Sequence, residues 1–183
     1  MSEAKAWVTD TRVYTHLARA GHTDILRDLA PRGVVLVPDD VDREIQRGQT
    51  RYADIVSVAD TSWAHLTVLS EDEVGTQLLI KAAMGGGPHE HLGECAVIAC
   101  ALHRDLTALL DDRHALSQAD LRGVPSHDTL WLVVEAYATL FCYDRDRAAK
   151  VVDDLLATDM YLPIDSGESL FAWAYEAGLL PKE

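Results

Sequence analysis

The chain has 183 residues, of which 48% are hydrophobic, and this length and composition fit one compact domain of ordinary core size. Its formal net charge is −14 at pH 7, the opposite of the broad basic surface that drives non-specific binding to nucleic acid, so a nucleic-acid substrate would need a local patch, a metal ion or another subunit to hold it. Because no long apolar run is present and Met1 to Lys5 lack the basic-then-apolar pattern of a secretory signal, we expect no membrane segment and a cytoplasmic location.

The first buried strand is predicted at residues 5 to 9, and Asp10 directly follows it. A helix is predicted next, because apolar residues recur at the spacing of one helix face: Val13, Tyr14, Leu17 and Ala18. Asp10 lies one turn before Val13 on this face, so it is expected to be inward. A second helix at about residues 22–30, a turn at 31–33 and a second strand at 34–37 follow.

Residues 38–48 are predicted to form a helix with an acidic first turn. Glu44 shares a face of this helix with Val41 and Ile45, which makes it a second inward acid. Residues 50–62 show a weaker helical pattern, with a stripe formed by Tyr52, Ile55, Val56 and Ala59. The third strand is predicted at residues 63–69.

The main clue to function lies in the stretch from residue 88 to 113, which a predicted helix and a hinge precede. Ser70 to Glu73 has the form of a capping box and predicts a helix to about Met84, followed by a flexible hinge at residues 85–88. The next helix has an apolar face formed by Val97, Ile98, Ala101 and Leu102. Glu94 lies one turn earlier on that face.

Residues 106–110 form a short apolar run, as expected of a strand that is covered on both sides, and this run stops at Asp111 and Asp112. A helix that points a carboxylate inward, next to a strand that ends on two carboxylates, costs free energy unless a cation is shared between them. The pattern therefore predicts a cation site.

The remaining chain is predicted to hold a helix at 113–121, a brief edge strand at 124–126, a helix at 129–142 with Asp128 as its cap, and two tail helices at about 145–157 and 169–177. The cysteines lack CxxC spacing and lie in apolar helical stretches, so we expect reduced core residues: Cys95, Cys100 and Cys142.

Strands that alternate with helices predict a parallel sheet, and sites in such sheets lie outside the carboxyl ends of the strands. Four acids converge there by this pattern, with Asp112 adjacent: Asp10, Glu44, Glu94 and Asp111. Oxygen ligands without histidine or thiolate favour Mg²⁺ or Mn²⁺, and a pair of such ions about 3.5–4 Å apart suits in-line hydrolysis of a phosphodiester.

The sequence resembles the PIN-domain family, which includes the VapC-type toxins, over roughly residues 6–135. The matching segments are WVTDTRVYTHLARAGHTDIL, VLVPDDVDREI, GECAVIACAL and TALLDDRHALSQA. The resemblance implies a three-layer α/β/α sandwich with a parallel sheet and a metal-dependent ribonuclease activity, with Asp10, Glu44, Glu94 and Asp111 as metal-binding residues. We expect residues 1–183 to form one domain, with this core at about 6–135 and a C-terminal helical extension at about 143–183.

Several interpretations stay open. Arg12 stands where relatives often have a small polar residue, and it either binds a substrate phosphate or pairs with a site carboxylate. Asp112 is either a metal contact or a helix cap, and each of the other acids taken alone is also typical of a cap. His91 and Glu94 have the three-residue spacing of a zinc pair, although the HExxH spacing is absent.

Our functional prediction is a Mg²⁺- or Mn²⁺-dependent endoribonuclease, the toxin of a toxin–antitoxin pair, with RNA as substrate. Because the chain is acidic and would attract RNA poorly by itself, we expect a homodimer or a complex with a basic antitoxin protein. The alternative is a non-catalytic PIN-fold module that binds protein or RNA, which the charge of −14 and the presence of Arg12 in the site favour.

Overall fold

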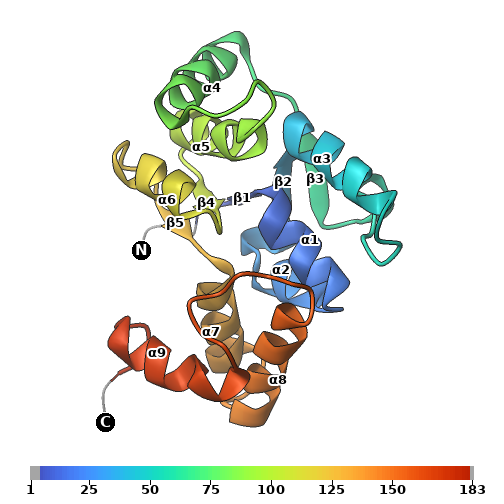
Figure 1. Cartoon of the computed structure of the whole chain (residues 1–183), viewed down its shortest axis with the longest axis vertical. Helices are drawn as coiled ribbons and strands as arrows, with labels where there is room; N and C mark the ends of the chain where they lie inside the picture. The colour runs from blue at the N-terminus through green and yellow to red at the C-terminus, as the bar shows by residue number, and fades with distance from the viewer. Residues whose placement is uncertain (1–4, 182–183) are drawn as a thin grey trace.

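The protein, described here by a computed structural model for residues 5–181, is an α/β sandwich built on a five-stranded parallel sheet with the order β3-β2-β1-β4-β5 (Figure 1). The strands are β1 (Trp7–Thr9), β2 (Val35–Pro38), β3 (Ala64–Thr67), β4 (Thr107–Leu109) and β5 (Ser126–His127). The helices are α1 (Thr11–Arg19), α2 (Thr23–Leu29), α3 (Asp39–Gln49), α4 (Glu71–Met84), α5 (Leu92–Arg104), α6 (Arg113–Asp120), α7 (Thr129–Thr139), α8 (Arg145–Leu156) and α9 (Leu170–Glu176), with 3₁₀ turns at Pro31–Gly33, Val58–Asp60 and Gly167–Ser169.

The helices cover both faces of the sheet in a three-layer arrangement. Helices α4, α5 and α6 lie on one side, and α1, α2 and α7 lie on the other, with α8 packed against α7 (Figure 1). The central strands β1 and β4 are buried along their whole length, as expected of a parallel sheet covered on both faces. The predicted three-layer fold with a parallel sheet is thus confirmed.

The order of the strands reverses beside β1. The chain adds β2 and β3 on one side of β1 and then returns to place β4 and β5 on the other side. Val8 of β1 pairs with Leu36 of β2 and with Ala108 of β4. The carboxyl ends of β1 and β4 therefore meet at a switch point, where open α/β sheets commonly bind ligands.

Two of the helix starts carry the caps that the sequence indicates, whereas α3 begins without a side-chain cap. Ser70 and Glu73 form the expected capping box of α4. Asp128 caps α7 as predicted, because its carboxylate accepts the N–H of Trp131 at 2.7 Å.

The helix predicted at residues 50–62 is wrong, because only the 3₁₀ turn Val58–Asp60 forms there. The carbonyls that would serve a helix are used by side chains instead: Gln49 donates to the Ile55 carbonyl at 3.1 Å, and the Tyr14 hydroxyl donates to the Val56 carbonyl at 2.9 Å. Ile55 consequently reaches the core, whereas Val56 of the same supposed stripe is 42% exposed.

Smaller corrections concern the edges of the core. Leu102 is 42% exposed rather than buried, because helix α5 is enclosed by α3, α4 and the sheet only as far as Ala101 and its last turn faces outward. Cys142 is exposed and lies beyond α7, which ends at Thr139, so it is not a core residue. The last strand forms at Ser126–His127 rather than at 124–126, where Ser126 pairs with Ala108.

The C-terminal helices are packed onto the sandwich. A Cβ atom at Gly167 would lie 2.0 Å from the Ala149 carbonyl oxygen, so only glycine lets the chain pass this close to α8. No helix within residues 5–181 combines the length and the apolarity needed to cross a membrane. The first four residues, on which the expectation about a secretory signal partly rested, lie outside the described residues.

Candidate active site

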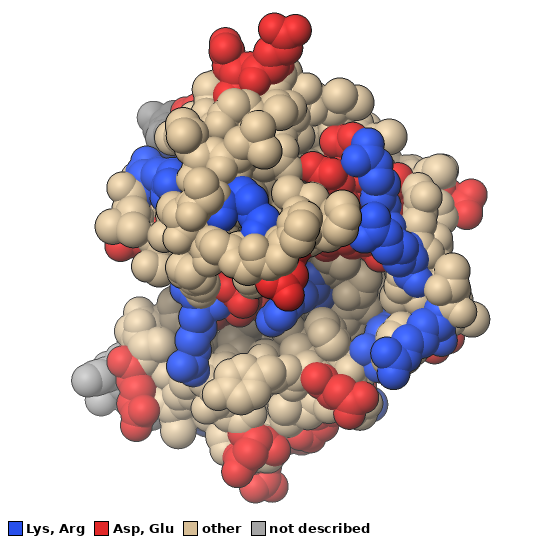
Figure 2. All heavy atoms as spheres, turned by 45° about the horizontal axis from the view of Figure 1, so that its top comes forward, with Lys and Arg blue, Asp and Glu red and all other residues tan. Residues whose placement is uncertain are grey.

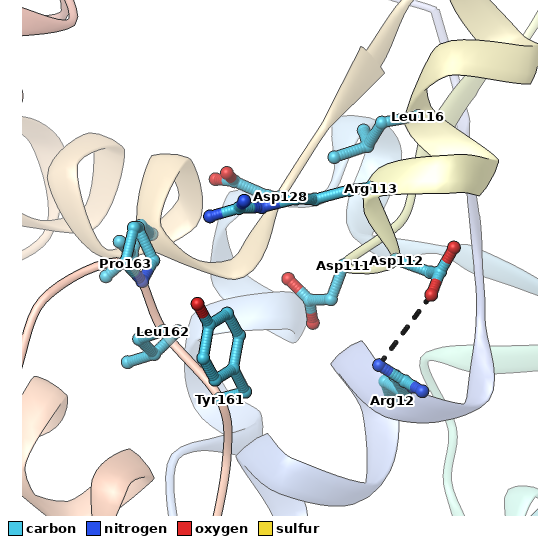
Figure 3. Close-up of a pocket in the computed structure, with 10 residues that line it drawn as sticks. Arg12, Asp111, Asp112, Arg113, Leu116, Asp128, Tyr161, Leu162 and Pro163 are labelled. Atoms are coloured by element: carbon cyan, nitrogen blue, oxygen red, sulfur yellow. Dashed lines mark ion pairs between the residues drawn. The ribbon is translucent and has the colours of Figure 1, made fainter.

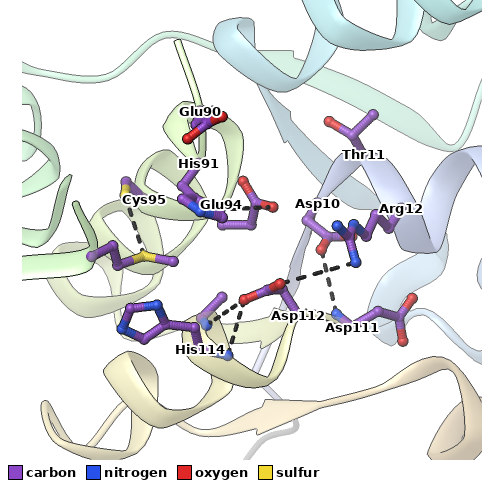
Figure 4. Close-up of polar contacts among 12 residues, drawn as sticks. Asp10, Thr11, Arg12, Glu90, His91, Glu94, Cys95, Asp111, Asp112 and His114 are labelled. Carbon is purple, nitrogen blue, oxygen red and sulfur yellow. Dashed lines mark hydrogen bonds and ion pairs between the residues drawn. The ribbon is translucent and has the colours of Figure 1, made fainter. Parts of the chain in front are cut away.

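Asp10 stands at the end of β1 and is 1% exposed. One carboxylate oxygen, Oδ1, accepts the N–H of Val13 at 2.8 Å and so caps α1, while Oδ2 faces the N–H of Asp111 at 3.4 Å. Burial raises the pKa of Asp10 well above its ordinary value, and the charges of Asp111 and Glu94 raise it further. Asp10 is therefore both a helix cap and the centre of an acidic cluster (Figure 4).

Asp111 stands at the end of β4, beside Asp10 at the switch point. Its Oδ1 accepts the N–H of Thr129 at 2.8 Å, and its Oδ2 accepts the Thr129 hydroxyl at 2.7 Å. Burial raises the pKa of Asp111 to about 6, although the bonds from Thr129 and the charge of Arg12 oppose the rise. Thr129, a residue the sequence interpretation did not assign, thus fixes the orientation of this carboxylate.

Glu44 reaches the cluster from α3. Its carboxylate accepts the Thr11 hydroxyl and the backbone N–H of Gly93 in the first turn of α5. Burial raises the pKa of Glu44, and the charge of Glu94 adds to the rise. A Cβ atom at Gly93 would stand 2.9 Å from Glu44 Oε2, so the absence of a side chain at position 93 is what admits this acid.

Glu94 completes the set from the first turn of α5. Its side chain is 12% exposed, and Oε1 lies 3.9 Å from His91 Nδ1. Its charge raises the pKa of both Asp10 and Glu44, so it links the acid of α3 to the acids of the strands. The structure therefore brings the four predicted acids into one electrostatically connected cluster.

The cluster is not arranged as a closed cage. Within residues 5–181, no three His, Cys, Asp or Glu side chains are grouped tightly enough to hold a metal ion as they stand. Asp10, Glu44 and Asp111 are each turned toward a hydrogen-bond donor of the protein. The donor set nevertheless fits a hard cation, because it consists of carboxylates whose mutual repulsion only positive charge or protonation relieves.

Asp112 and Arg12 lie at the rim of the cluster (Figure 4). Asp112 Oδ1 accepts the N–H groups of His114 and Ala115 at 2.9 and 3.0 Å, so this residue caps α6. Its Oδ2 is 4.0 Å from the guanidinium of Arg12, whose side chain is 54% exposed. The side chain of Arg12 is thus only weakly held by this long ion pair.

The zinc interpretation gains little from the geometry. Glu90 is turned to the hinge, where its carboxylate accepts the N–H of Gly87 at 2.7 Å. Close to the His91–Glu94 pair stands the ring of His114, whose centroid is 6.5 Å from that of His91. These side chains do not form a three-ligand group among the described residues.

A cavity of about 280 Å³ adjoins the acids on the side of Asp111 (Figure 3). Its lining residues are Arg12, Asp111, Asp112, Arg113, Leu116, Asp128, Leu130, Tyr161, Leu162 and Pro163. The space-filling view shows a hollow in the molecular surface with both acidic and basic side chains in and around it (Figure 2). The sequence did not predict that residues 161–163 form a wall of this cavity. The available signal was a tyrosine two residues before a proline in the predicted loop.

Two comparisons bear on identity. A family model described as a PIN domain matches residues 6–172, a span that includes α8 and reaches into α9. No curated protein matches the sequence.

Proposed function

Because the chain belongs to the PIN-domain family, whose members are generally nucleases, we propose that it is a Mg²⁺- or Mn²⁺-dependent endoribonuclease, a hydrolase that cleaves phosphodiester bonds of RNA. The observation that carries the proposal is the acidic cluster at the switch point, where Asp10 is buried and two further carboxylates raise its pKa. A cluster of this kind stores repulsion that a divalent cation relieves.

The metal-binding residues in this proposal are Asp10, Glu44, Glu94 and Asp111. Bound divalent cations would supply the activation of the attacking water and the neutralisation of the leaving oxygen. The protein supplies the positions: Thr129 holds Asp111, Thr11 and the first turn of α5 hold Glu44, and the start of α1 holds Asp10. Asp112 offers its Oδ2 as a further contact, since its Oδ1 is engaged in the cap of α6.

Arg12 is the proposed contact for the substrate. Its guanidinium is exposed at the rim, and the 4.0 Å separation from Asp112 is too long for a strong ion pair that would hold it in place. A guanidinium in this position suits a phosphate of the RNA backbone.

The net charge of −14 supports the further proposal that the protein acts with a second subunit, as a homodimer or bound to a basic antitoxin, and that it is the toxin of such a pair. An acidic monomer attracts RNA poorly by itself. Light scattering and co-purification with a basic protein test this part.

The decisive experiment is cleavage of single-stranded RNA by the purified chain with Mn²⁺, with Mg²⁺ and with a chelator. We expect cleavage only with metal, and its loss in Asp10→Asn and Glu94→Gln. Asp144→Asn is the matched control, because Asp144 caps α8 through the N–H of Arg147 and lies outside the acidic cluster. RNA binding without cleavage under all conditions would favour the non-catalytic binding module instead.

A further inference from the structure

The cavity beside the acids has two unlike walls. Asp111 of the cluster lines one wall together with Arg12 and Asp112 from its rim, while residues 161–163 from the loop between α8 and α9 line the opposite wall (Figure 3). A group in this cavity therefore lies next to the carboxylates that the proposed function assigns to metal.

Tyr161 is the most exposed feature of the loop wall. Its side chain is 78% exposed, whereas an aromatic ring of this size is ordinarily at least half covered in a folded protein. The guanidinium carbon of Arg113 lies 5.9 Å from the centre of the Tyr161 ring. An exposed ring with a guanidinium beside it is the arrangement on which proteins stack unpaired bases while a cation contacts the phosphate.

The loop is held firmly enough to present this ring in one place. Met160 directly before it is buried, and Leu162 directly after it packs against the core. Tyr161 thus projects between two anchored neighbours. The anchoring matters because a stacking platform gains affinity when its position is fixed before the ligand arrives.

A second anchor joins the loop to the helix that carries Arg12. Thr158 is 5% exposed, and its hydroxyl donates to the Leu155 carbonyl at 2.6 Å, so it accepts from His16 Nδ1 at 2.7 Å. Burial, assisted by the charges of Arg19 and Arg12, lowers the pKa of His16 to about 4, which keeps the ring neutral at pH 7. Both walls of the cavity are therefore tied to α1.

We propose that this cavity is a subsite for one unpaired nucleotide of single-stranded RNA, adjacent to the phosphate that is cleaved. Tyr161 stacks on the base, Arg113 contacts its phosphate, and Leu116, Leu130 and Pro163 cover the base edge. A volume of about 280 Å³ is just below the usual range of ligand pockets, roughly 300–1,000 Å³, and suits one nucleoside rather than a duplex. The inference rests on the proposed ribonuclease function for its substrate.

The test measures binding without cleavage. Affinity for a short single-stranded oligoribonucleotide is measured by fluorescence anisotropy in Ca²⁺ and in chelator, and KM and kcat are measured separately in Mn²⁺. Tyr161→Ala should weaken binding about tenfold, as expected from the loss of one base stack, and should raise KM. Tyr161→Phe should retain affinity because the ring remains.

Tyr143→Ala is the matched control. Tyr143 is 66% exposed and lies away from the cavity, with its ring against that of Tyr137, so its removal should leave RNA affinity unchanged. Equal melting temperatures of the three variants and the wild type exclude a folding defect.

Undiminished RNA affinity in Tyr161→Ala would overturn the subsite, even if Asp10→Asn shows that the protein is a ribonuclease. Conversely, a wild-type protein that binds RNA through Tyr161 but never cleaves it would support the subsite and refute the nuclease. Binding of a basic peptide, rather than RNA, that depends on Tyr161 would also overturn the proposal and assign the cavity to a protein partner.

Discussion

At the scale of single residues, Asp10 combines two roles that the sequence interpretation set against each other. Its carboxylate caps α1 through Val13, and the same carboxylate is the most buried member of the acidic cluster. Asparagine caps a helix about as well as aspartate does, so a change to asparagine separates the two roles.

We therefore predict that Asp10→Asn abolishes cleavage and leaves the metal-free protein as stable as the wild type or more stable, because it removes a repelled charge and keeps the cap. Asp10→Ala should also abolish cleavage, and its free energy of unfolding should fall by roughly 0.5–2 kcal/mol because alanine cannot cap the helix. The rise in melting temperature on adding Mn²⁺ should shrink in both variants. Thermal melts in chelator and in Mn²⁺, together with the cleavage assay, check this; a destabilised Asp10→Asn that still cleaves RNA would reduce Asp10 to a structural cap.

Gly93 offers a test of Glu44 that leaves the acid itself in place. Because a Cβ atom at position 93 would stand 2.9 Å from Glu44 Oε2, Gly93→Ala must push this flexible carboxylate aside. We expect reduced metal affinity and reduced cleavage, with a melting temperature equal to or above that of the wild type, because alanine is the better helix former. Isothermal titration with Mn²⁺ measures the affinity, and an unchanged value would show that Glu44 does not contact the cation.

Asp111 predicts a dependence of stability on pH. Its pKa is about 6 in the folded protein against an ordinary 3.8, so the folded state holds a proton that the unfolded state has already lost between these values. Its contribution to stability is present below pH 3.8 and is lost as the pH rises through about 6. Asp111→Asn should not lose this stability as the pH rises, because asparagine does not ionise. The free energy of unfolding of the variant relative to the wild type, measured with urea in chelator, should increase from pH 4 to pH 7; a flat difference would contradict the raised pKa.

At the scale of secondary structure, Asp112 joins the start of α6 to the site. Asp112→Asn should keep the cap and the metal-free stability but reduce the stabilisation by Mn²⁺, because its Oδ2 no longer carries charge. The free energy of unfolding of Asp112→Ala should be lower by roughly 0.5–2 kcal/mol with or without metal, because the cap of α6 is lost. If Mn²⁺ stabilises Asp112→Asn as much as it stabilises the wild type, Asp112 caps α6 and does not contact the metal.

The elements that position the acids were predictable because each follows from a local pattern. Buried strands appear in the sequence as apolar runs, and Asp10 and Asp111 are the first residues after two such runs. Glu44 and Glu94 were placed by helical spacing, which the structure keeps in α3 and α5. The parallel sheet followed from the alternation of strand and helix patterns, whereas the order of its strands was not predicted.

The parts that were missed depend on contacts between distant segments. Residues 50–62 lost their helix to hydrogen bonds from Tyr14 and Gln49, which no local pattern reveals. Thr129 binds Asp111 across 18 positions, and the loop wall of the cavity reaches the cluster only because α8 packs against α7 and α1. Local propensity carries no information about such packing.

At the scale of the whole molecule, the charge of −14 limits how strongly RNA can be held by electrostatics. With Arg12 and Arg113 as the phosphate contacts, the logarithm of affinity should fall with the logarithm of salt concentration with a slope of about −1.4, from roughly −0.7 per contact on a single strand. Arg12→Ala should flatten the slope by about half and raise KM more than it lowers kcat. Binding titrations at several salt concentrations measure this, and a much steeper slope would point to a basic surface on a second subunit.

The bond between His16 and Thr158 joins residues that are 142 positions apart. The four acids of the cluster, and Thr129 that orients Asp111, all lie within the first 129 residues, whereas Tyr161 is added fifty residues after Asp111. A chain still under synthesis therefore holds the acids and the residues that orient them before it holds Tyr161, the proposed contact for the base. Maturation of such a nuclease on the ribosome would proceed in two steps, and the step that gives it a hold on RNA comes last.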